Sequence, residues 1–212
     1  MIYVTGYGPF PGVPSNPTAD LAIALHGTQF GQHTVCSEVL PVSYEIALGR
    51  IRAAIRRLEP TLVVNMGVDV RADRVRVEST GVNRALAGRL DVDGSDWGGR
   101  GLLAERAEDE ALVTSLDVAR IVRAAERAGY ASCVSDNAGR YLCNAALYAS
   151  LLELRQIGRD GRACFLHLPD VGAVTEDGMR WSADRLREAV GVILPAALEQ
   201  LAMFSAQQSG LE

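Results

Sequence analysis

The stretch at residues 135–144 could carry nucleophilic chemistry, because it runs from a predicted strand through a turn of small residues into a predicted helix. This places Cys143 near a helix N-terminus, where free backbone N–H groups and the helix dipole favour the thiolate. Cys36, Cys133 and Cys164 fall within predicted strands and are interpreted as small buried apolar residues. Cys143 is therefore the candidate nucleophile, although a cysteine packed inside a helix would suit the same position.

A thiolate nucleophile needs a proton acceptor, and His167 is the best placed histidine. It lies in the apolar run of residues 165–169, at the carboxyl end of a predicted strand, where burial demands a hydrogen-bond partner. Cys143 and His167 are expected at the same carboxyl edge of a sheet, which permits a thiol–imidazole pair. The alternative is a structural histidine with another partner. Glu78 could orient the imidazole, but the alternation around it favours a solvent-facing carboxylate on an edge strand.

Alternating strands and helices must position these side chains. The sequence predicts strands at residues 2–5, 33–40, 62–66, 74–83, 131–134 and 163–168. It predicts helices at 17–27, 43–58, 116–129 and 142–154 and from 183 onward, the last kinked or divided at Pro195. Residues 84–110 have no clear period and are predicted to form a long excursion. The pattern predicts a single α/β domain over residues 1–212: a three-layer, open twisted, mostly parallel sheet with helices on both faces.

Composition narrows the class of protein. The chain has 212 residues, of which 48% are hydrophobic, and this predicts a globular protein with a substantial core. A formal net charge of −5 argues against nucleic acid or an anionic membrane as the main partner. We find no apolar run of the ~18–20 residues that a membrane span needs and no secretory signal pattern, which predicts a cytoplasmic protein. Four cysteines without a CxxC pair predict neither a disulfide scaffold nor a zinc site, and we expect no metal or cofactor.

The glycine-rich segment at residues 6–12 follows the first predicted strand, where a dinucleotide-binding loop would lie. Three prolines within residues 9–14 remove backbone donors and keep a helix from opening there, which disfavours nucleotide binding. Two interpretations remain for this segment. It is either a structural turn or a stiff loop that presents Tyr7 and Phe10 to a ligand at the carboxyl end of the strand.

In combination, these motifs resemble those of pyroglutamyl peptidase I, also called pyrrolidone carboxyl peptidase, a family of cysteine peptidases. The turn at residues 138–144, Ala-Gly-Arg-Tyr-Leu-Cys-Asn, is similar to the family's nucleophile motif. Residues 5–10 with Asn16-Pro17 resemble its opening loop, residues 40–42 the end of its second strand, and residues 165–169 its histidine strand. Glu78 stands eleven residues after Gly67, and Asn83 five further on, as the family's glutamate and asparagine do.

The resemblance implies a Cys143–His167–Glu78 triad in an exopeptidase that hydrolyses the amide bond after an N-terminal pyroglutamyl residue. Pyroglutamyl peptides are the implied substrates, and their flat, uncharged lactam requires aromatic walls and a few backbone hydrogen bonds. The family also implies association into a homodimer or homotetramer. Carried over by position, the implied substrate-binding residues are Tyr7, Phe10, Val42, Val68, Arg89, Tyr141 and Leu142, with Arg89 near the oxyanion.

The sequence departs from the family pattern around the substrate. Residues 67–72 read Gly-Val-Asp-Val-Arg-Ala where the family usually has Gly-Gly-Arg, and Ser79 replaces an arginine. Tyr7 replaces a phenylalanine, and residues 91–93 differ from the usual Pro-Asp-Asn. These departures leave two alternatives: a thiol-dependent amidohydrolase acting on a different small amide, and a non-catalytic homologue with an altered pocket in which Cys143 is a core residue.

Overall fold

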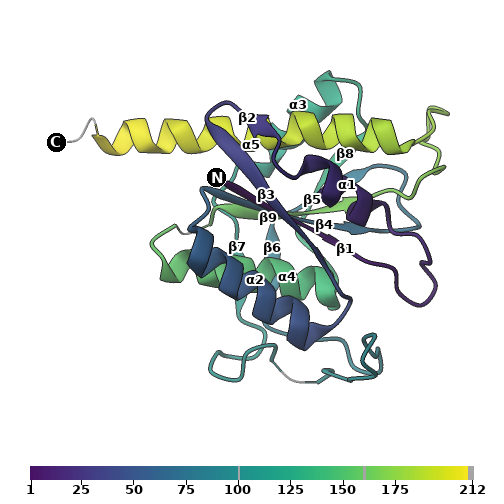
Figure 1. Cartoon of the computed structure of the whole chain (residues 1–212), viewed down its shortest axis with the longest axis vertical. Coiled ribbons are helices and arrows are strands. Elements are labelled where there is room, and N and C mark those ends of the chain that lie inside the picture. Colours follow the sequence, from purple (N-terminus) through teal and green to yellow (C-terminus); the bar gives the residue numbers. More distant parts are fainter. Residues whose placement is uncertain (100, 160, 210–212) are drawn as a thin grey trace.

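The computed structural model describes residues 1–99, 101–159 and 161–209, and its centre is a seven-stranded sheet in the order β2-β3-β1-β4-β9-β5-β8 (Figure 1). The strands are β1 (Ile2–Tyr7), β2 (Gln29–Phe30), β3 (His33–Leu40), β4 (Leu62–Val68), β5 (Val75–Glu78), β8 (Ser132–Ser135) and β9 (Ala163–Leu168). A separate antiparallel pair joins β6 (Thr80–Val82) to β7 (Ala111–Val113).

Helices cover both faces of this sheet. On one face lie α1 (Pro17–Leu25), α3 (Val118–Arg127) and α5 (Ala183–Ser209), and on the other lie α2 (Tyr44–Leu58) and α4 (Leu142–Gln156) (Figure 1). Each layer of helices packs on the sheet through its own cluster of buried apolar side chains. The predicted three-layer α/β architecture is therefore confirmed. None of these helices, over the part of the chain described, is long and apolar enough to cross a membrane.

Capping residues explain where most of the helices begin. Asn16 accepts a hydrogen bond from the Thr18 N–H at 3.2 Å, and Pro17 occupies the first turn of α1. Ser43 and Asp117 cap α2 and α3 in the same way. Helix α4 differs, because no side chain among the described residues caps its first turn after Tyr141. Its leading N–H groups therefore lack a side-chain acceptor.

The sheet is mostly parallel, but the short strand β2 runs antiparallel to β3, and a second reversal at β5 was not predicted from the sequence. Strands β3, β1, β4 and β9 run parallel, whereas β5 and β8 run parallel to each other and antiparallel to β9. The single strand predicted at 74–83 is two strands, because the chain leaves the main sheet after Glu78 and pairs as β6 with β7. Strand β5 therefore lies between β9 and β8, and β8 forms the edge.

The excursion between β6 and β7 has no helix or strand among its described residues, as predicted, yet it is fixed at several points. The Asn83 side chain accepts a hydrogen bond from the Leu103 N–H and donates to backbone carbonyls at residues 103, 106 and 107. Asp91 accepts a bond from the Tyr44 N–H at 3.0 Å, and Trp97 stacks on the Tyr44 ring at a centroid distance of 5.2 Å. The excursion is therefore packed against α2.

The last helix was predicted to be kinked or divided at Pro195, and the structure excludes the division. Helix α5 runs from Ala183 to Ser209 as one helix with Pro195 inside it, so the chain is not divided there. Proline removes one backbone donor and crowds the preceding turn. In α5, buried apolar side chains on both sides of Pro195, including Leu194 and Ala197, pack against the sheet and hold the helix together.

Candidate active site

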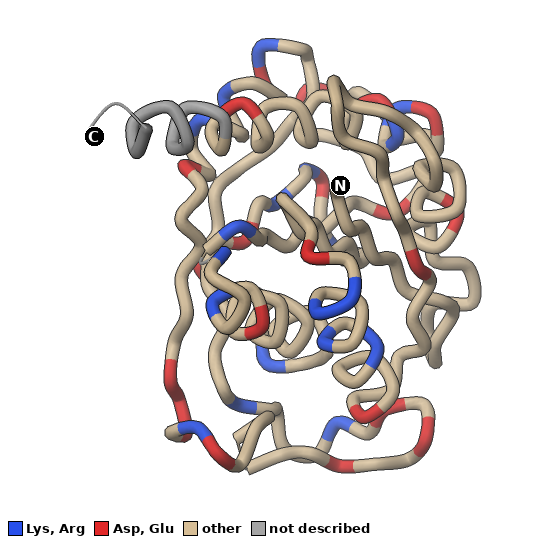
Figure 2. Tube along the Cα trace, turned by 60° about the vertical axis from the view of Figure 1, so that its left-hand side comes forward, with Lys and Arg blue, Asp and Glu red and all other residues tan. Residues whose placement is uncertain are grey.

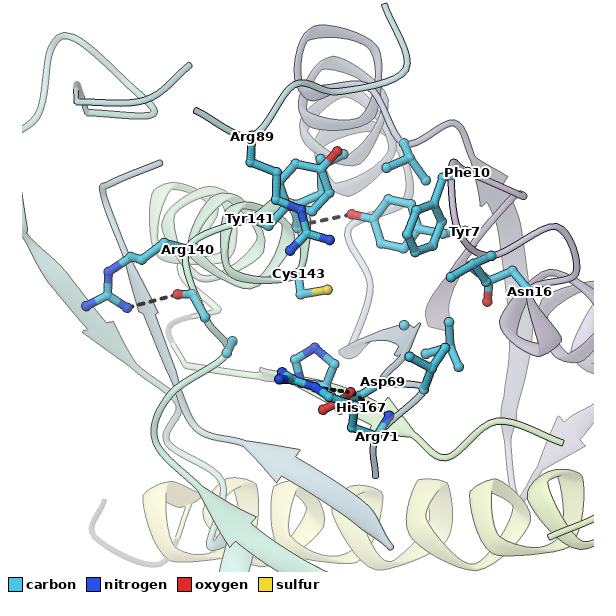
Figure 3. Close-up of a pocket in the computed structure, with 18 of the residues that line it drawn as sticks. Tyr7, Phe10, Asn16, Asp69, Arg71, Arg89, Arg140, Tyr141, Cys143 and His167 are labelled. Atoms are coloured by element: carbon cyan, nitrogen blue, oxygen red, sulfur yellow. Dashed lines mark hydrogen bonds and ion pairs between the residues drawn. The ribbon is translucent and has the colours of Figure 1, made fainter. Parts of the chain in front are cut away.

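A pocket of about 890 Å³ opens where β1, β4 and β9 end, on the face of the sheet that α4 covers (Figure 3). Alternate residues of a strand point to the same face. Tyr7, Gly67 and His167 share the α4 face with Phe165, and the β4–β9 register places Gly67 opposite His167. The start of α4 brings Cys143 to the same pocket.

His167 is held by a buried carboxylate. Its Nδ1 lies 2.8 Å from Oε1 of Glu78, whose side chain has no solvent exposure. Burial alone would raise the pKa of Glu78, but hydrogen bonds from His167 and Ser135 and the positive charges of His167 and Arg76 lower it overall. Glu78 is therefore an anion that fixes the ring and leaves its other nitrogen to face the pocket.

Cys143 lies next to the imidazole ring of His167, with its sulfur directed into the pocket (Figure 3). A Cβ atom at Gly67 would lie 3.3 Å from this sulfur, so the glycine leaves the space that the thiol occupies. Burial lowers the pKa of His167, but the charge of Cys143, its hydrogen bond and those of Glu78 raise the value to about 9. The ring is therefore protonated at neutral pH.

The path by which Cys143 reaches His167 differs from the prediction. Strand β8 runs antiparallel to β9, and its last residue, Ser135, pairs with Glu78, which itself pairs with Phe165. The carboxyl ends of β8 and β9 therefore do not share an edge. Residues 136–141 carry the chain from the end of β8 to the pocket, and α4 begins there.

The prediction of a solvent-facing Glu78 on an edge strand is wrong. Strand β8 covers β5 on its outer side, and Glu78 is fully buried. Its cationic neighbour is Arg76, whose Nε lies 3.3 Å from Glu78 Oε1 and whose Nη2 lies 2.9 Å from Asp69 Oδ2. Asp69, Arg76 and Glu78 thus form a continuous chain of ionic contacts that ends at His167.

The residues predicted to bind substrate all line this pocket. Tyr7 is buried and its hydroxyl donates to the Leu142 carbonyl at 3.2 Å, which joins β1 to the start of α4. The Tyr141 hydroxyl donates to the Leu90 carbonyl at 2.9 Å, and the Arg89 guanidinium lies 4.1 Å from the centre of the Tyr141 ring. The remaining members of the set, at the walls and floor, are Phe10, Val42, Val68 and Leu142.

Sequence reasoning missed several neighbours of the site. Asn16, the cap of α1, also lines the pocket, and its position beside Pro17 was the available signal. The Asp69–Arg76 pair could not be found from spacing, because it depends on the reversal of β5. The prediction that Cys36, Cys133 and Cys164 are all buried is confirmed only for Cys164, because Cys36 and Cys133 are half-buried.

This arrangement can perform thiol chemistry. A buried carboxylate, an imidazolium and a thiol stand in sequence beside the uncapped N-terminus of a helix, which offers backbone donors to an oxyanion. Within residues 1–99, 101–159 and 161–209 no group of three or more His, Cys, Asp or Glu side chains could hold a metal ion. The fold and the pocket are those of a thiol hydrolase built on an α/β sheet.

Comparison with known proteins agrees with this class. The sequence profile of the pyroglutamyl peptidase family matches residues 1–198, and the chain belongs to that family. A pyrrolidone-carboxylate peptidase from Mycobacterium tuberculosis is 32% identical over 176 residues, covering 82% of this chain and 78% of that protein. A pyrrolidone-carboxylate peptidase from Oceanobacillus iheyensis is 28% identical over 168 residues, covering 79% of this chain and 83% of that protein.

Solved structures show the same fold. A mutant pyrrolidone carboxyl peptidase from Pyrococcus furiosus superimposes with a TM-score of 0.86 at 26% identity, covering 94% of this chain and 99% of that chain. Pyrrolidone carboxyl peptidase from Thermococcus litoralis gives a TM-score of 0.85 at 25% identity, with 95% and 94% covered.

Proposed function

We propose that this chain is a cysteine exopeptidase that hydrolyses the amide bond after an N-terminal pyroglutamyl residue, with Cys143, His167 and Glu78 as its catalytic triad. The observation that carries the proposal is the 2.8 Å bond between His167 Nδ1 and the fully buried Glu78 carboxylate, on a ring that faces the Cys143 sulfur. Membership of the pyroglutamyl peptidase family supports the substrate.

The reaction follows from these positions. The Cys143 thiolate attacks the amide carbonyl carbon of the pyroglutamyl residue, and the carbonyl π electrons move onto the oxygen, which the first N–H groups of α4 stabilise. The intermediate collapses as the C–N bond breaks, and His167 gives its proton to the leaving amine. Water, deprotonated by His167, then attacks the thioester and releases pyroglutamate and the thiolate. Glu78 holds the ring and stabilises its charged form throughout.

Substrate recognition rests on shape. A pyroglutamyl residue has no α-ammonium group, so its lactam must be held by aromatic faces and backbone groups. Phe10, Tyr7 and Tyr141 supply aromatic surface around the Cys143 sulfur. The one acidic lining side chain among the described residues, Asp69, is occupied by Arg76, so it does not act as a counter-ion for an amine.

The setting of the enzyme is part of the same proposal. We infer a single-domain protomer that acts in the cytoplasm on peptides, without metal or cofactor, and associates into a homodimer or homotetramer as members of this family commonly do. The thiol and imidazole supply the nucleophile and the proton transfers, so the proposed reaction requires no other group. Size-exclusion chromatography with light scattering measures the association.

Release of a fluorescent amine from a pyroglutamyl amide tests the proposed function. We expect turnover by the wild-type protein, a fall of at least about 10³-fold in Cys143→Ser, and loss of activity with iodoacetamide. Cys133→Ser is the matched control, because Cys133 is half-buried in β8 outside the pocket lining. Turnover that survives both the serine substitution and alkylation would overturn the thiol mechanism.

A second function is favoured by one feature, the altered loop at residues 68–71, which lines the pocket. A different wall would suit a different amide, and the chain would then be a thiol-dependent amidohydrolase. Rapid, pH-dependent alkylation of Cys143 together with absence of pyroglutamyl turnover would select this alternative.

A further inference from the structure

The pocket has an apolar part and a cationic part. Tyr7 and Phe10 lie on one side of the Cys143 sulfur, whereas Arg140 lies on the other (Figure 3). Four arginines line the pocket, against one acidic side chain among the described residues: Arg71, Arg76, Arg89 and Arg140, against Asp69. The whole chain has a formal net charge of −5, and its acidic residues are spread over the helices and loops (Figure 2). The pocket therefore opposes the charge of the protein that surrounds it.

Much of this positive charge is not neutralised. Arg76 is bound to Asp69 and Glu78. Arg71 forms an ion pair with Asp69, whose Oδ1 lies 3.8 Å from the Arg71 Nε, but the Arg71 side chain is 89% exposed. Arg140 donates to the Gly139 carbonyl at 2.9 Å, and no carboxylate among the described residues forms an ion pair with Arg140 or Arg89. Arg89 and Arg140 thus have no carboxylate partner among the described residues, and the exposed Arg71 guanidinium shares Asp69 with Arg76.

The chemistry decides which part of the substrate meets these groups. The uncharged lactam belongs in the apolar part, and it has no group for a guanidinium to neutralise. His167 must reach the leaving amine, so the residue after pyroglutamate lies on the His167 side of the sulfur. Arg76 is the cross-strand partner of His167, and residues 69–71 follow β4, the strand next to β9. The leaving residue is therefore flanked by the cationic part.

We propose that the positive charge of Arg71 and Arg140 at the pocket creates a subsite for a carboxylate carried by the leaving residue, whereas Arg89 packs on Tyr141 across the Cys143 sulfur from His167 (Figure 3). The carboxylate is either the acidic side chain that follows pyroglutamate or the terminal carboxylate of a pyroglutamyl dipeptide. A guanidinium binds a carboxylate with two parallel hydrogen bonds, and a positive pocket raises the local concentration of an anionic substrate. This inference rests on the proposed function and specifies its substrate class.

Two pairs of substrates distinguish the sources of the carboxylate. Pyroglutamyl-glutamate amide against pyroglutamyl-glutamine amide tests the side chain, and pyroglutamyl-alanine against its amide tests the terminal carboxylate. The quantity measured is the ratio of kcat/KM within each pair. We expect at least one ratio to be about 3- to 10-fold above one at low ionic strength, and to fall in about 0.5 M salt, where screening is strong.

Substitution assigns the preference to residues. In Arg71→Ala/Arg140→Ala we expect the ratio to fall toward one, and in Arg71→Lys/Arg140→Lys to stay above one, because the charge is kept. Arg50→Ala/Arg57→Ala is the matched control, since it removes two charges from α2, outside the pocket lining. The control must keep the wild-type ratio.

Each outcome decides the question. A ratio above one that the double alanine variant loses and the control keeps supports the subsite, and the pair that shows it identifies the carboxylate. Ratios at or below one with efficient turnover of the amides overturn the subsite and leave the peptidase function in place. A preference unchanged in the double alanine variant overturns its assignment to these arginines. Failure to cleave any pyroglutamyl substrate overturns both proposals.

Discussion

Glu78→Gln is the sharpest perturbation of the proposed triad, because it removes the charge of a fully buried side chain and keeps its shape. The carboxylate oxygen that receives the bond lies 2.8 Å from His167 Nδ1. A glutamine there loses the attraction to the imidazolium, and its amide NH₂ can turn toward Nδ1 and select the wrong tautomer of the ring. The variant should fold, since Arg76 remains to donate to the amide oxygen.

The size of the effect follows from the pKa of His167, which is about 9 against an ordinary 6.5. That difference corresponds to about 3 kcal/mol in favour of the imidazolium. The charge and hydrogen bond of Cys143 contribute before those of Glu78. Removing the charge of Glu78 and its hydrogen bond therefore lowers the His167 pKa in the variant, by less than that whole difference. Loss of ring orientation adds to this, and we expect kcat/KM to fall by about 10²- to 10⁴-fold.

The assay is kcat/KM against pH for a pyroglutamyl amide. The folded pKa of His167 is raised, so the imidazolium is present below about pH 9 and is lost as the pH rises through that value. Wild-type activity should therefore decline through about pH 9, and the decline should begin at lower pH in Glu78→Gln. Glu126→Gln, on the exposed side of α3, is the control. An unchanged rate and an unchanged alkaline limb would refute the role of Glu78.

Two further substitutions test the surroundings of the site. In Gly67→Ala the new Cβ would lie 2.7 Å from Phe165 Cζ and 3.3 Å from the Cys143 sulfur. We therefore expect activity to fall at least about tenfold and the free energy of unfolding to fall by about 1–3 kcal/mol. The control is Gly49→Ala on α2, where nothing lies within 4 Å of the new Cβ; it should stabilise the protein by about 0.5–1 kcal/mol, and equal shifts in melting temperature for the two variants would contradict this reasoning. Asn83→Ala removes hydrogen bonds that fix the excursion at residues 84–110. Limited digestion with trypsin should therefore cut this excursion faster than in the wild-type protein, and the free energy of unfolding should fall by about 1–3 kcal/mol. An unchanged digestion rate would show that other contacts hold the excursion.

Local features of the sequence predicted the elements well. Asn16, Ser43 and Pro17 act over one turn of helix, so their consequences do not depend on the rest of the fold. The apolar run at residues 62–66 likewise forms a strand buried on both faces. The residues expected to bind substrate were placed by a family resemblance spread over the chain, and they line one pocket.

The pairing of strands that lie far apart in the sequence could not be predicted from such local features. The alternation around Glu78 is real, with Val75 and Val77 in the core that α3 and α5 cover. The other face was expected to be solvated, but α4 and the loop before it occupy that side, and β8 covers the strand edge. The direction of β5 is set by its partners rather than by its own composition. For this reason the burial of Glu78 and its contact with Arg76 emerged only from the tertiary structure.

The antiparallel register of β5 and β9 has a consequence for how such a site can vary. Arg76 pairs with His167 and Glu78 with Phe165, so a shift by a single residue would turn Glu78 to the opposite face and bring an aliphatic side chain beneath the imidazole. Residues 69–74 connect β4 to β5, so a change in their length leaves that pairing in place but alters the segment that carries Asp69 and Arg71 at the pocket. Within β5 itself, one inserted or deleted residue would break the contact between Glu78 and His167.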